Sequence, residues 1–352
     1  MNDPTSHADV LCTRIGRAGV ITLNRPQALN ALTRAMCLTM SATLADWARD
    51  PSVALVIVRG TGDRAFCAGG DIRALYESGR SGTSYRRDFY ADEYRLNTQI
   101  KEYPKPYVAL MDGITMGGGV GVAIHGSHRI VSERTVFAMP ETGIGLCPDV
   151  GATYFLPRLP GVLGRYLGLT GARLDGADMM VVGLGDHYVP SHAMDRLFDE
   201  LTGQPDVAVD DLCTALQTDP PPSDLPARMS EIGDVFSAPS LEAVVARVGA
   251  DADSWQGAAR KAILGASPTA LKIAWRQIAI GGSLDFRDCM RLEYRLVQRI
   301  MDGHDFYEGV RAAVIDKDRS PAWRPPRLED VTEAEIDRYF ATAGADELTF
   351  PT

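Results

Sequence analysis

The 352-residue sequence has no long run of apolar residues. The aliphatic run at 53–58 is far shorter than the about 20 residues that a membrane-spanning helix needs. The opening residues, MNDPTSHADV, contain neither a basic segment nor an apolar one, so no secretory signal is expected. These absences predict a cytoplasmic protein without a membrane partner.

The six cysteines are scattered, and none forms a C-x-x-C pair with another. Cysteines this far apart in a long chain indicate neither a disulfide framework nor a zinc site. The histidine pairs His125/His128 and His187/His192 do not form, with cysteines or carboxylates, the set of ligands that a metal site needs. We therefore expect no metal ion, and we expect the cysteines to be buried thiols.

An excess of basic residues is also missing. The chain has 36 lysines and arginines against 46 aspartates and glutamates, which gives a net charge of −10. This balance, without a patch of basic and aromatic residues, argues against nucleic acid as a partner. It does not exclude an anionic ligand, because a few local basic residues can bind one.

Hydrophobic residues make up 45% of the chain, and their pattern predicts an α/β fold. In the N-terminal part, short apolar strands alternate with amphipathic segments. Examples are a hairpin at 10–15 and 20–23, a helix at 33–50 and a buried strand at 53–59. Repeated strand–helix units with buried strands indicate helices packed on a sheet.

The pattern changes near residue 203. Residues 204–240 are rich in proline and polar residues, which predicts a linker with little regular structure. The expected organisation is a core at 8–203, this linker, and a helical region at 241–345. The Ser267-Pro268 pair is typical of a helix start. Helices are expected at 241–249, 253–265, 269–280 and 283–301.

Residues 137–157, FAMPETGIGLCPDVGATYFLP, carry two acidic side chains, Glu141 and Asp149, in otherwise apolar sequence. Prolines and glycines prevent a regular helix there. An ionised carboxylate is costly in an apolar setting, so each must be paired, hydrogen-bonded or raised in pKa. A raised carboxyl pKa suits general acid–base chemistry. The alternative is that each carboxylate only accepts backbone amides at a turn.

Two glycine-rich turns follow apolar strands. One is Phe66–Asp71, and the other is the triple glycine at 117–119, which opens a helix. Such turns present unpaired backbone N–H groups, and two of them together can hold an oxyanion. Neither matches the G-x-G-x-x-G or G-x-x-x-x-G-K-[ST] nucleotide patterns. The alternative is that these glycines serve tight packing.

Three segments stand out together: ITLNRPQALNAL at 21–32, AFCAGGDI at 65–72 and GITMGGGVG at 113–121. In sequence and in order along the chain they resemble the crotonase, or enoyl-CoA hydratase/isomerase, superfamily. Further segments resemble its hydroxyacyl-CoA hydrolase subgroup: EYRLN at 93–97, MPETGIGLCPDVGATYFLPRLPG at 139–161, LTGARLDGAD, SPTALK at 267–272 and DFYEGVRAAVIDKDRSPAW at 305–323. The resemblance covers about residues 10–325.

The resemblance implies a spiral of ββα units with a helical C-terminal region. It implies an oxyanion hole made by the backbone amides of Gly70 and Gly118. Ala68, Gly69 and Asp71 flank the first amide, where the family's backbone meets coenzyme A. No separate cofactor is expected, because coenzyme A is part of the substrate. The C-terminal helices, which help some members to trimerise, allow a homo-oligomer.

Three positions separate hydration from hydrolysis in this superfamily. Hydratases use two glutamates; this chain has Gly121 where the first would stand, and Glu141 matches the second. It has Asp149, like the hydrolase subgroup, where hydratases carry glycine. Glu93 matches a glutamate of that subgroup, although on its own it would be interpreted as a solvated helix residue.

The resemblance therefore implies hydrolysis of a short hydroxyacyl-CoA thioester, 3-hydroxyisobutyryl-CoA or a similar compound of valine catabolism. Glu141 would act at the thioester carbonyl, as a nucleophile or as a base that activates water; both roles stay open. Asp149 and Glu93 would recognise the substrate hydroxyl.

Two alternatives remain at this point. One is an enoyl-CoA hydratase or isomerase of fatty-acid metabolism, and the other is a non-catalytic protein that binds coenzyme A. Arg25 and Lys317 are candidates for holding the nucleotide end of coenzyme A. For each of them the alternative is an ordinary surface charge.

Overall fold

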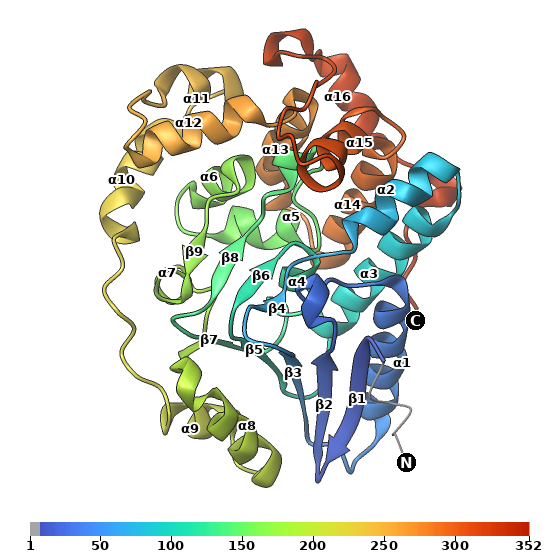
Figure 1. Cartoon of the computed structure of the whole chain (residues 1–352), viewed down its shortest axis with the longest axis vertical. Helices are drawn as coiled ribbons and strands as arrows, with labels where there is room; N and C mark the ends of the chain where they lie inside the picture. Colours follow the sequence, from blue (N-terminus) through green and yellow to red (C-terminus); the bar gives the residue numbers. More distant parts are fainter. Residues whose placement is uncertain (1–7, 352) are drawn as a thin grey trace. The chain divides into compact units, whose positions relative to one another are not determined.

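The computed structural model describes residues 8–351. Residues 1–7, which include most of the stretch where no secretory signal is expected, lie outside the described residues. Across 8–351 the structure has strands β1 to β10 and α-helices α1 to α16 (Figure 1).

The strands are β1 (Val10–Ile15), β2 (Ala18–Leu23), β3 (Leu55–Gly60), β4 (Ala65–Cys67), β5 (Tyr107–Met111), β6 (Ile114–Met116), β7 (His128–Val131), β8 (Val136–Ala138), β9 (Leu174–Asp175) and β10 (His187–Tyr188). The helices are α1 (Arg34–Arg49), α2 (Ile72–Ser81), α3 (Tyr85–Lys101), α4 (Gly118–Gly121), α5 (Ala152–Phe155), α6 (Leu163–Thr170), α7 (Gly176–Val181), α8 (Met194–Gly203), α9 (Val209–Thr214), α10 (Leu225–Phe236), α11 (Leu241–Arg247), α12 (Trp255–Gly265), α13 (Pro268–Gly281), α14 (Phe286–Ile300), α15 (Asp305–Val310) and α16 (Glu333–Phe340).

Two compact units share the chain, and each combines segments that are not consecutive. The first holds the described residues up to Asp71 together with Arg95–Phe137 and Leu174–Asp224. The second holds Ile72–Tyr94, Ala138–Arg173 and the described residues from Leu225 onward. The expected organisation was three consecutive regions, and units made of non-consecutive segments do not test its boundaries at 203 and 240. That division stays a prediction.

A six-stranded sheet in the order β1-β2-β3-β5-β7-β10 forms the first unit's framework. Strands β1 and β2 pair antiparallel as the expected hairpin, and every later pairing in this sheet is parallel. The parallel strands are buried and joined through helices, as the alternation in the sequence predicts. The α/β class is confirmed.

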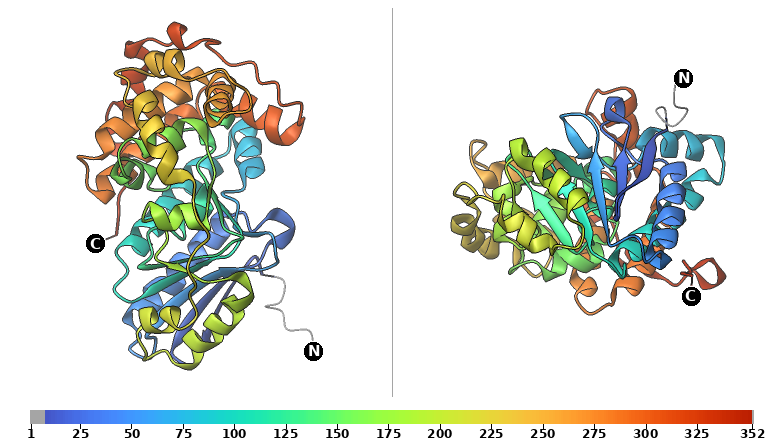
Figure 2. Two further views of the ribbon diagram at one scale, coloured as in Figure 1. Left: turned by 90° about the vertical axis from the view of Figure 1, so that its left-hand side faces the viewer. Right: turned by 90° about the horizontal axis from the view of Figure 1, so that it is seen from below.

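Both faces of this sheet are covered by helices. Residues of β2, β3, β5 and β7 form one apolar cluster with α8 and α9, which lie against the strands in both views of Figure 2. Ala18 and Val20 of β2 belong to that cluster, so Gly19, which lies between them, faces the other side of the sheet. Helix α1 lies on that side. A Cβ at Gly19 would lie 2.4 Å from the Trp47 ring of α1. Glycine therefore allows the close approach of α1.

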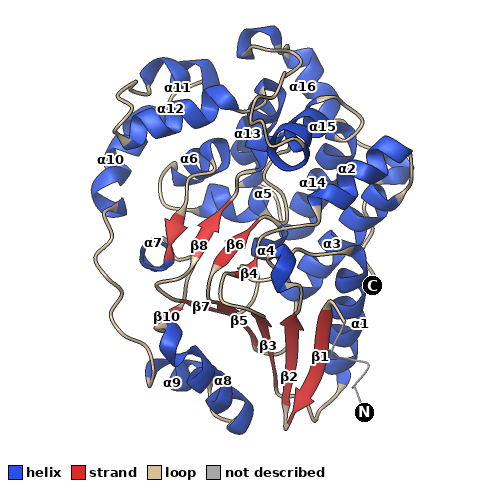
Figure 3. Cartoon of the chain, in the orientation of Figure 1, coloured by secondary structure: helices blue, strands red, loops and turns tan. Residues whose placement is uncertain are grey.

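A second sheet has the order β4-β6-β8-β9 (Figure 3). Strands β4 and β6 run parallel, so their carboxyl ends meet at one edge. The two glycine-rich turns follow these strands. The sheet thereby brings the turns together.

The second unit is mainly helical. Helix α13 begins after Ser267, whose hydroxyl accepts the Ala270 N–H, with Pro268 as its first residue. This confirms the expected helix start. The expected C-terminal helices are also present as α11 to α14, with ends shifted by a few residues.

The segment 204–240 differs from its prediction. It contains α9 and α10 instead of an irregular linker. Pro226 is the second residue of α10, where proline is tolerated because the first helical N–H groups have no partner in the helix. The number of prolines therefore overstates how irregular the segment is, and 215–224 is its longest stretch without helix or strand.

In the part of the chain that the structure describes, the helices are too short or too polar to cross a bilayer.

The packing of the two glycine turns makes a first prediction. A Cβ at Gly119 would lie 2.0 Å from the carbonyl oxygen of Cys67, which is backbone and cannot rotate away. We expect Gly119→Ala to lower the free energy of unfolding by about 1–3 kcal/mol, measured by urea denaturation. Gly203→Ala is the control, because no atom lies within 4 Å of its added Cβ. Equal stability of the two variants would contradict the packing.

Candidate functional site

The second unit brings Glu93, Glu141 and Asp149 together with a further acid, Glu293; we call these four residues the acid cluster. All four are buried, with exposed fractions of 2%, 5%, 4% and 0% in that order. Helix α3 carries Glu93, and α14 carries Glu293. The interpretation of Glu93 as a solvated helix residue is therefore wrong.

Glu141 and Asp149 lie in short turns rather than in a regular helix, as the sequence predicts. Glu141 begins a 3-10 turn (Glu141–Ile144), and Asp149 comes shortly before α5. Val150 and Gly151, which follow Asp149, have φ angles of +52° and +95°. A β-branched residue rarely adopts such an angle, so the surrounding contacts must hold this turn in place.

Glu293 provides one of these contacts. Its two carboxylate oxygens accept the N–H groups of Gly151 and Thr153, each at 2.8 Å. Burial raises the pKa of Glu293 to about 8, against the lowering effect of the Gly151 amide. An acid that would be costly alone thus stabilises the backbone next to Asp149.

Gln277 of α13 provides another contact. Its side-chain amide donates to the carbonyl of Pro148 and to the hydroxyl of Thr153, both at 2.6 Å. The turn at 148–153 is therefore held by one polar side chain from α13 and one from α14. Neither residue was predicted from the sequence.

The sequence does contain a signal that Glu293 is buried and paired. The buried residues of α14 include Phe286, Met290, Val297 and Ile300, which recur at helical spacing, and Glu293 occupies the same face. A charged residue within an apolar helix face must have a polar partner inside the fold. The sequence does not indicate which partner.

Asp149 is held by Tyr94, another residue that was not predicted. The Tyr94 hydroxyl donates to the Asp149 carboxylate at 2.6 Å. Burial raises the pKa of Asp149 to about 7, and the Tyr94 hydrogen bond partly opposes this increase. At that pKa a carboxyl group can both release and accept a proton near neutrality.

Glu93 and Glu141 each retain an unused oxygen. Glu93 Oε1 and Glu141 Oε2 are buried without a hydrogen-bond partner among the described residues. Burial, and then the charge of Asp149, raises the pKa of both groups well above its usual value. Across residues 8–351, no lysine, arginine or histidine forms an ion pair with the acid cluster. The cluster therefore retains protons that exposed acids would release.

The predicted oxyanion amides belong to the first unit. Leu32 donates to the Gly69 carbonyl and accepts the Asp71 N–H, both at 2.8 Å, so the Gly70 N–H between them points away from Leu32. Gly118 is the first residue of α4, where an N–H has no partner within the helix. A Cβ at Gly69 would lie 3.8 Å from the Gly118 nitrogen. The two turns are therefore neighbours.

The other predicted contact residues also stabilise this turn. Ala68 donates to the Leu29 carbonyl at 3.0 Å, and the Asp71 carboxylate accepts from Arg25 at 3.0 Å. Arg25 is only 16% exposed at its side chain, so it is more than a free surface charge. Lys317 belongs to the second unit and has a φ of +60°. A role for either residue at coenzyme A stays a prediction.

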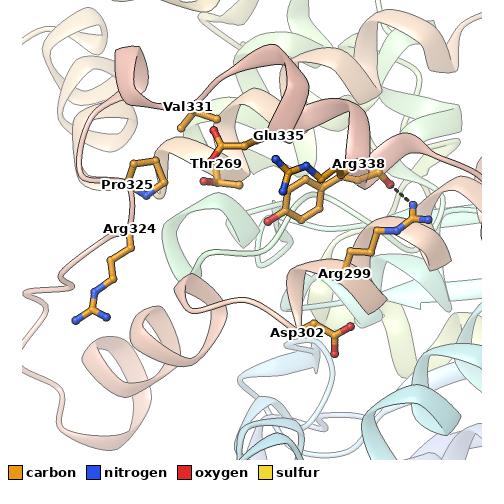
Figure 4. Close-up of a pocket in the computed structure, with 9 residues that line it drawn as sticks. Thr269, Arg299, Asp302, Arg324, Pro325, Val331, Glu335 and Arg338 are labelled. Carbon is orange, nitrogen blue, oxygen red and sulfur yellow. Dashed lines mark hydrogen bonds between the residues drawn. The ribbon is translucent and has the colours of Figure 1, made fainter.

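A cavity of about 350 Å³ lies elsewhere in the second unit, and none of the predicted site residues lines it. Figure 4 shows that its arginines do not converge, since Arg324 points away from Arg299 and Arg338. Arg299 donates to the Tyr339 carbonyl at 2.7 Å. We assign no ligand to this cavity.

Comparison with known proteins places the chain in a family. A family model described as enoyl-CoA hydratase/isomerase matches residues 18–340. The chain belongs to the enoyl-CoA hydratase/isomerase family. The resemblance expected from the motifs is therefore confirmed.

Relatives within this family are similar over nearly the full chain. A mitochondrial 3-hydroxyisobutyryl-CoA hydrolase of Xenopus tropicalis is 45% identical, covering 99% of this chain and 92% of its own length. The mitochondrial 3-hydroxyisobutyryl-CoA hydrolase of Homo sapiens is 43% identical and covers 97% and 91%. These names match the subgroup that the motifs indicate.

Solved structures of the family confirm the crotonase-type fold. A carnitinyl-CoA dehydratase from Mycobacterium thermoresistibile has a TM-score of 0.92 at 42% identity, covering 98% of this chain and 99% of that chain. An enoyl-CoA hydratase from Rhodobacter sphaeroides 2.4.1 has a TM-score of 0.92 at 43% identity, covering 97% and 100%.

The expected cytoplasmic location is contradicted. The curated relatives carry the word mitochondrial in their names, and this finding overturns the expectation. Composition and the lack of a membrane-spanning segment do not distinguish one aqueous compartment from another, which is why the prediction was wrong. Self-association is not tested by these comparisons and stays a prediction.

The raised pKa of Glu293 makes a prediction about stability. Its pKa is about 8 when folded, above the usual 4.5, so the folded protein binds this proton more tightly than the unfolded chain does. The resulting stabilisation is complete below pH 4.5 and is lost as pH rises through 8. Over this window Glu293 should reduce the free energy of unfolding by up to about 1.4 kcal/mol per pH unit.

Glu293→Gln removes the titrating group. We expect its urea-unfolding stability to vary less with pH than that of the wild type, and to be lower at pH 5, because one backbone N–H then faces an amide nitrogen. Glu77→Gln, at an exposed position of α2, is the control and should follow the wild type. Parallel pH curves for wild type and Glu293→Gln would contradict the assignment.

Proposed function

We propose that this enzyme hydrolyses a short hydroxyacyl-CoA thioester, 3-hydroxyisobutyryl-CoA or a similar compound, to the free hydroxy acid and coenzyme A. 3-Hydroxyisobutyryl-CoA would link the reaction to valine catabolism. The names of the curated relatives, at 43–45% identity over nearly the whole chain, support this choice.

The observation that carries the proposal is the acid cluster. Glu141 has a buried oxygen without a hydrogen-bond partner among the described residues, and Asp149 is a second carboxyl group, with a pKa of about 7. Thioester hydrolysis needs a group that attacks the carbonyl carbon or activates water, and a group that transfers protons; carboxyl groups can serve in both roles. Glu141 and Asp149 offer both.

Two routes use Glu141. As a nucleophile it would form an anhydride with the acyl group while the carbon–sulfur bond breaks, and water would then split the anhydride. As a base it would take a proton from water while the oxygen attacks the carbonyl carbon. In both routes the sulfur leaves as thiolate and receives a proton, and the net reaction consumes one water molecule.

The remaining predicted residues have supporting roles in this proposal. The amides of Gly70 and Gly118 would donate to the thioester oxygen as it becomes negative; losing one such donor typically costs about 3 kcal/mol of transition-state stabilisation. Ala68, Gly69 and Asp71 would shape the turn against coenzyme A. Asp149 and Glu93 would bind the substrate hydroxyl.

Hydration of an enoyl-CoA is a second candidate. It is favoured by the titles of the two solved structures at 42–43% identity, which name a dehydratase and a hydratase. Helix α4 argues against it, because its residues are Gly118, Gly119, Val120 and Gly121 and none can act as an acid or base. The first glutamate that hydratases of this family use is thus missing.

Assays of the wild-type enzyme with both substrates distinguish the two reactions. We expect release of free thiol from 3-hydroxyisobutyryl-CoA, followed with a thiol reagent, and little loss of the crotonyl-CoA absorbance. Hydration of crotonyl-CoA without thiol release from the hydroxyacyl thioester would overturn the proposed function.

Isosteric variants test the acids separately. We expect Glu141→Gln and Asp149→Asn each to lower kcat for thiol release by roughly 10²–10⁴-fold, since each removes a proton acceptor without changing the side-chain shape. Glu77→Gln removes an exposed carboxylate of the same unit and should leave kcat unchanged. Near-native activity of both cluster variants would refute the roles given to them.

A further inference from the structure

Tyr90 of α3 has a buried hydroxyl that the proposed function does not yet use. The residue is 2% exposed, and its oxygen has no hydrogen-bond partner among the described residues. Its ring packs against Phe89 at 5.4 Å and against Tyr94 at 5.7 Å between centroids. The ring is therefore fixed while the hydroxyl is unpaired, which is rare for a buried donor.

Glu93 presents the opposite kind of group on the same helix face. Tyr90 and Glu93 are three residues apart in α3, so their side chains are neighbours on one side of the helix. Glu93 Oε1 is buried and has no hydrogen-bond partner among the described residues. A phenol can donate a hydrogen bond, and a carboxyl oxygen can accept one whether the group is ionised or protonated, so residues 8–351 leave both a donor and an acceptor unused.

The surroundings keep the Tyr90 phenol protonated. Burial raises its pKa well above the usual value, and the negative charges of Asp149, Glu93 and others nearby raise it further. At neutral pH the group is therefore a donor. Tyr94, one turn further along α3, is different, because its hydroxyl already donates to Asp149.

A hydroxyl group on a ligand matches this pair of unused groups. An alcohol donates one hydrogen bond and accepts others, so it needs an acceptor and a donor at once. A carbonyl group could use only the donor, and an ammonium group only the acceptor. An alkyl group would leave both unpaired, which is costly in a buried site.

We propose that Tyr90 is the specificity residue that donates to the oxygen of the acyl-chain hydroxyl, while Glu93 accepts the proton of the same hydroxyl. This inference rests on the proposed function for the class of ligand, a hydroxyacyl thioester. It adds a donor to the two carboxyl groups already assigned to hydroxyl recognition. Glu93 and Asp149 can donate a hydrogen bond to the oxygen of the ligand hydroxyl only while they are protonated. Tyr90 supplies a donor that does not depend on their protonation.

The experiment measures the coupling between the Tyr90 hydroxyl and the ligand hydroxyl. It uses two analogues of coenzyme A in which CH₂ replaces the thioester sulfur: one carries the 3-hydroxyisobutyryl chain and the other the isobutyryl chain. Neither can be hydrolysed, so calorimetric Kd values report binding whether or not the enzyme is a hydrolase. The preference is the ratio of the two Kd values.

We expect the wild type to prefer the hydroxylated analogue, and Tyr90→Phe to reduce that preference by roughly tenfold, in line with one buried hydrogen bond. Affinity for the isobutyryl analogue should stay the same or increase. The Tm of Tyr90→Phe should be no lower than that of the wild type, because the hydroxyl it removes has no hydrogen-bond partner among residues 8–351.

Tyr107→Phe is the matched control. Tyr107 is equally buried, but its hydroxyl donates to the Val122 carbonyl at 2.9 Å in the first unit. Its removal should lower the Tm and leave the preference unchanged.

Three outcomes would overturn the inference: no preference in the wild type, an unchanged preference in Tyr90→Phe, or an equal loss of affinity for both analogues. Failure of the proposed function is seen separately, as absence of thiol release from 3-hydroxyisobutyryl-CoA by the wild type. The Kd ratios remain informative in that case.

Discussion

The structure of the second unit depends on one constraint: four carboxyl groups are buried close together, and among residues 8–351 no cation forms an ion pair with them. Ionised carboxylates in such a medium are costly, and several of them also repel each other. The cluster meets this constraint in two ways. All four acids have raised pKa values, so they keep protons to a higher pH than exposed acids do, and two of them, Asp149 and Glu293, also accept hydrogen bonds from Tyr94 or from backbone N–H groups.

The same constraint explains the backbone around Asp149. A turn with two consecutive positive φ angles is unfavourable by itself. Glu293 and Gln277 bind its amide and carbonyl groups from two long helices, which fixes the turn more firmly than a loop could. Neighbouring residues of one cluster thus differ in their contacts: Glu293 holds the turn, whereas Glu141 Oε2 has no hydrogen-bond partner among the described residues.

Much of the fold follows from local pattern, and the candidate site follows only in part. The hairpin, the buried parallel strands and the start of α13 depend on short-range signals, which a single sequence contains. Glu141 and Asp149 stand out because they are acids in apolar sequence. Their roles, and those of the glycine amides, stay predictions, because geometry alone does not test chemistry.

The missed residues have physical reasons for escaping notice. Gln277 and Glu293 act on a turn that lies more than a hundred residues earlier in the sequence, and no local pattern connects them to it. Tyr94 resembles any helical tyrosine until its partner is known. The irregular linker was wrong because proline breaks a helix interior but not its first turn. The cellular location was wrong because bulk composition carries no information about which aqueous compartment a protein enters.

The hydrogen bonds of Glu293 also bear on how the protein is made. Gly151 and its acceptor are 142 residues apart, so during synthesis the turn beside Asp149 leaves the ribosome long before α14 exists. Until then its N–H groups have no intended partner, and the nascent chain lacks the final arrangement of its acids. A gene fusion or truncation that removes α14 would therefore leave the turn beside Asp149 in the sequence without the carboxylate that holds its N–H groups.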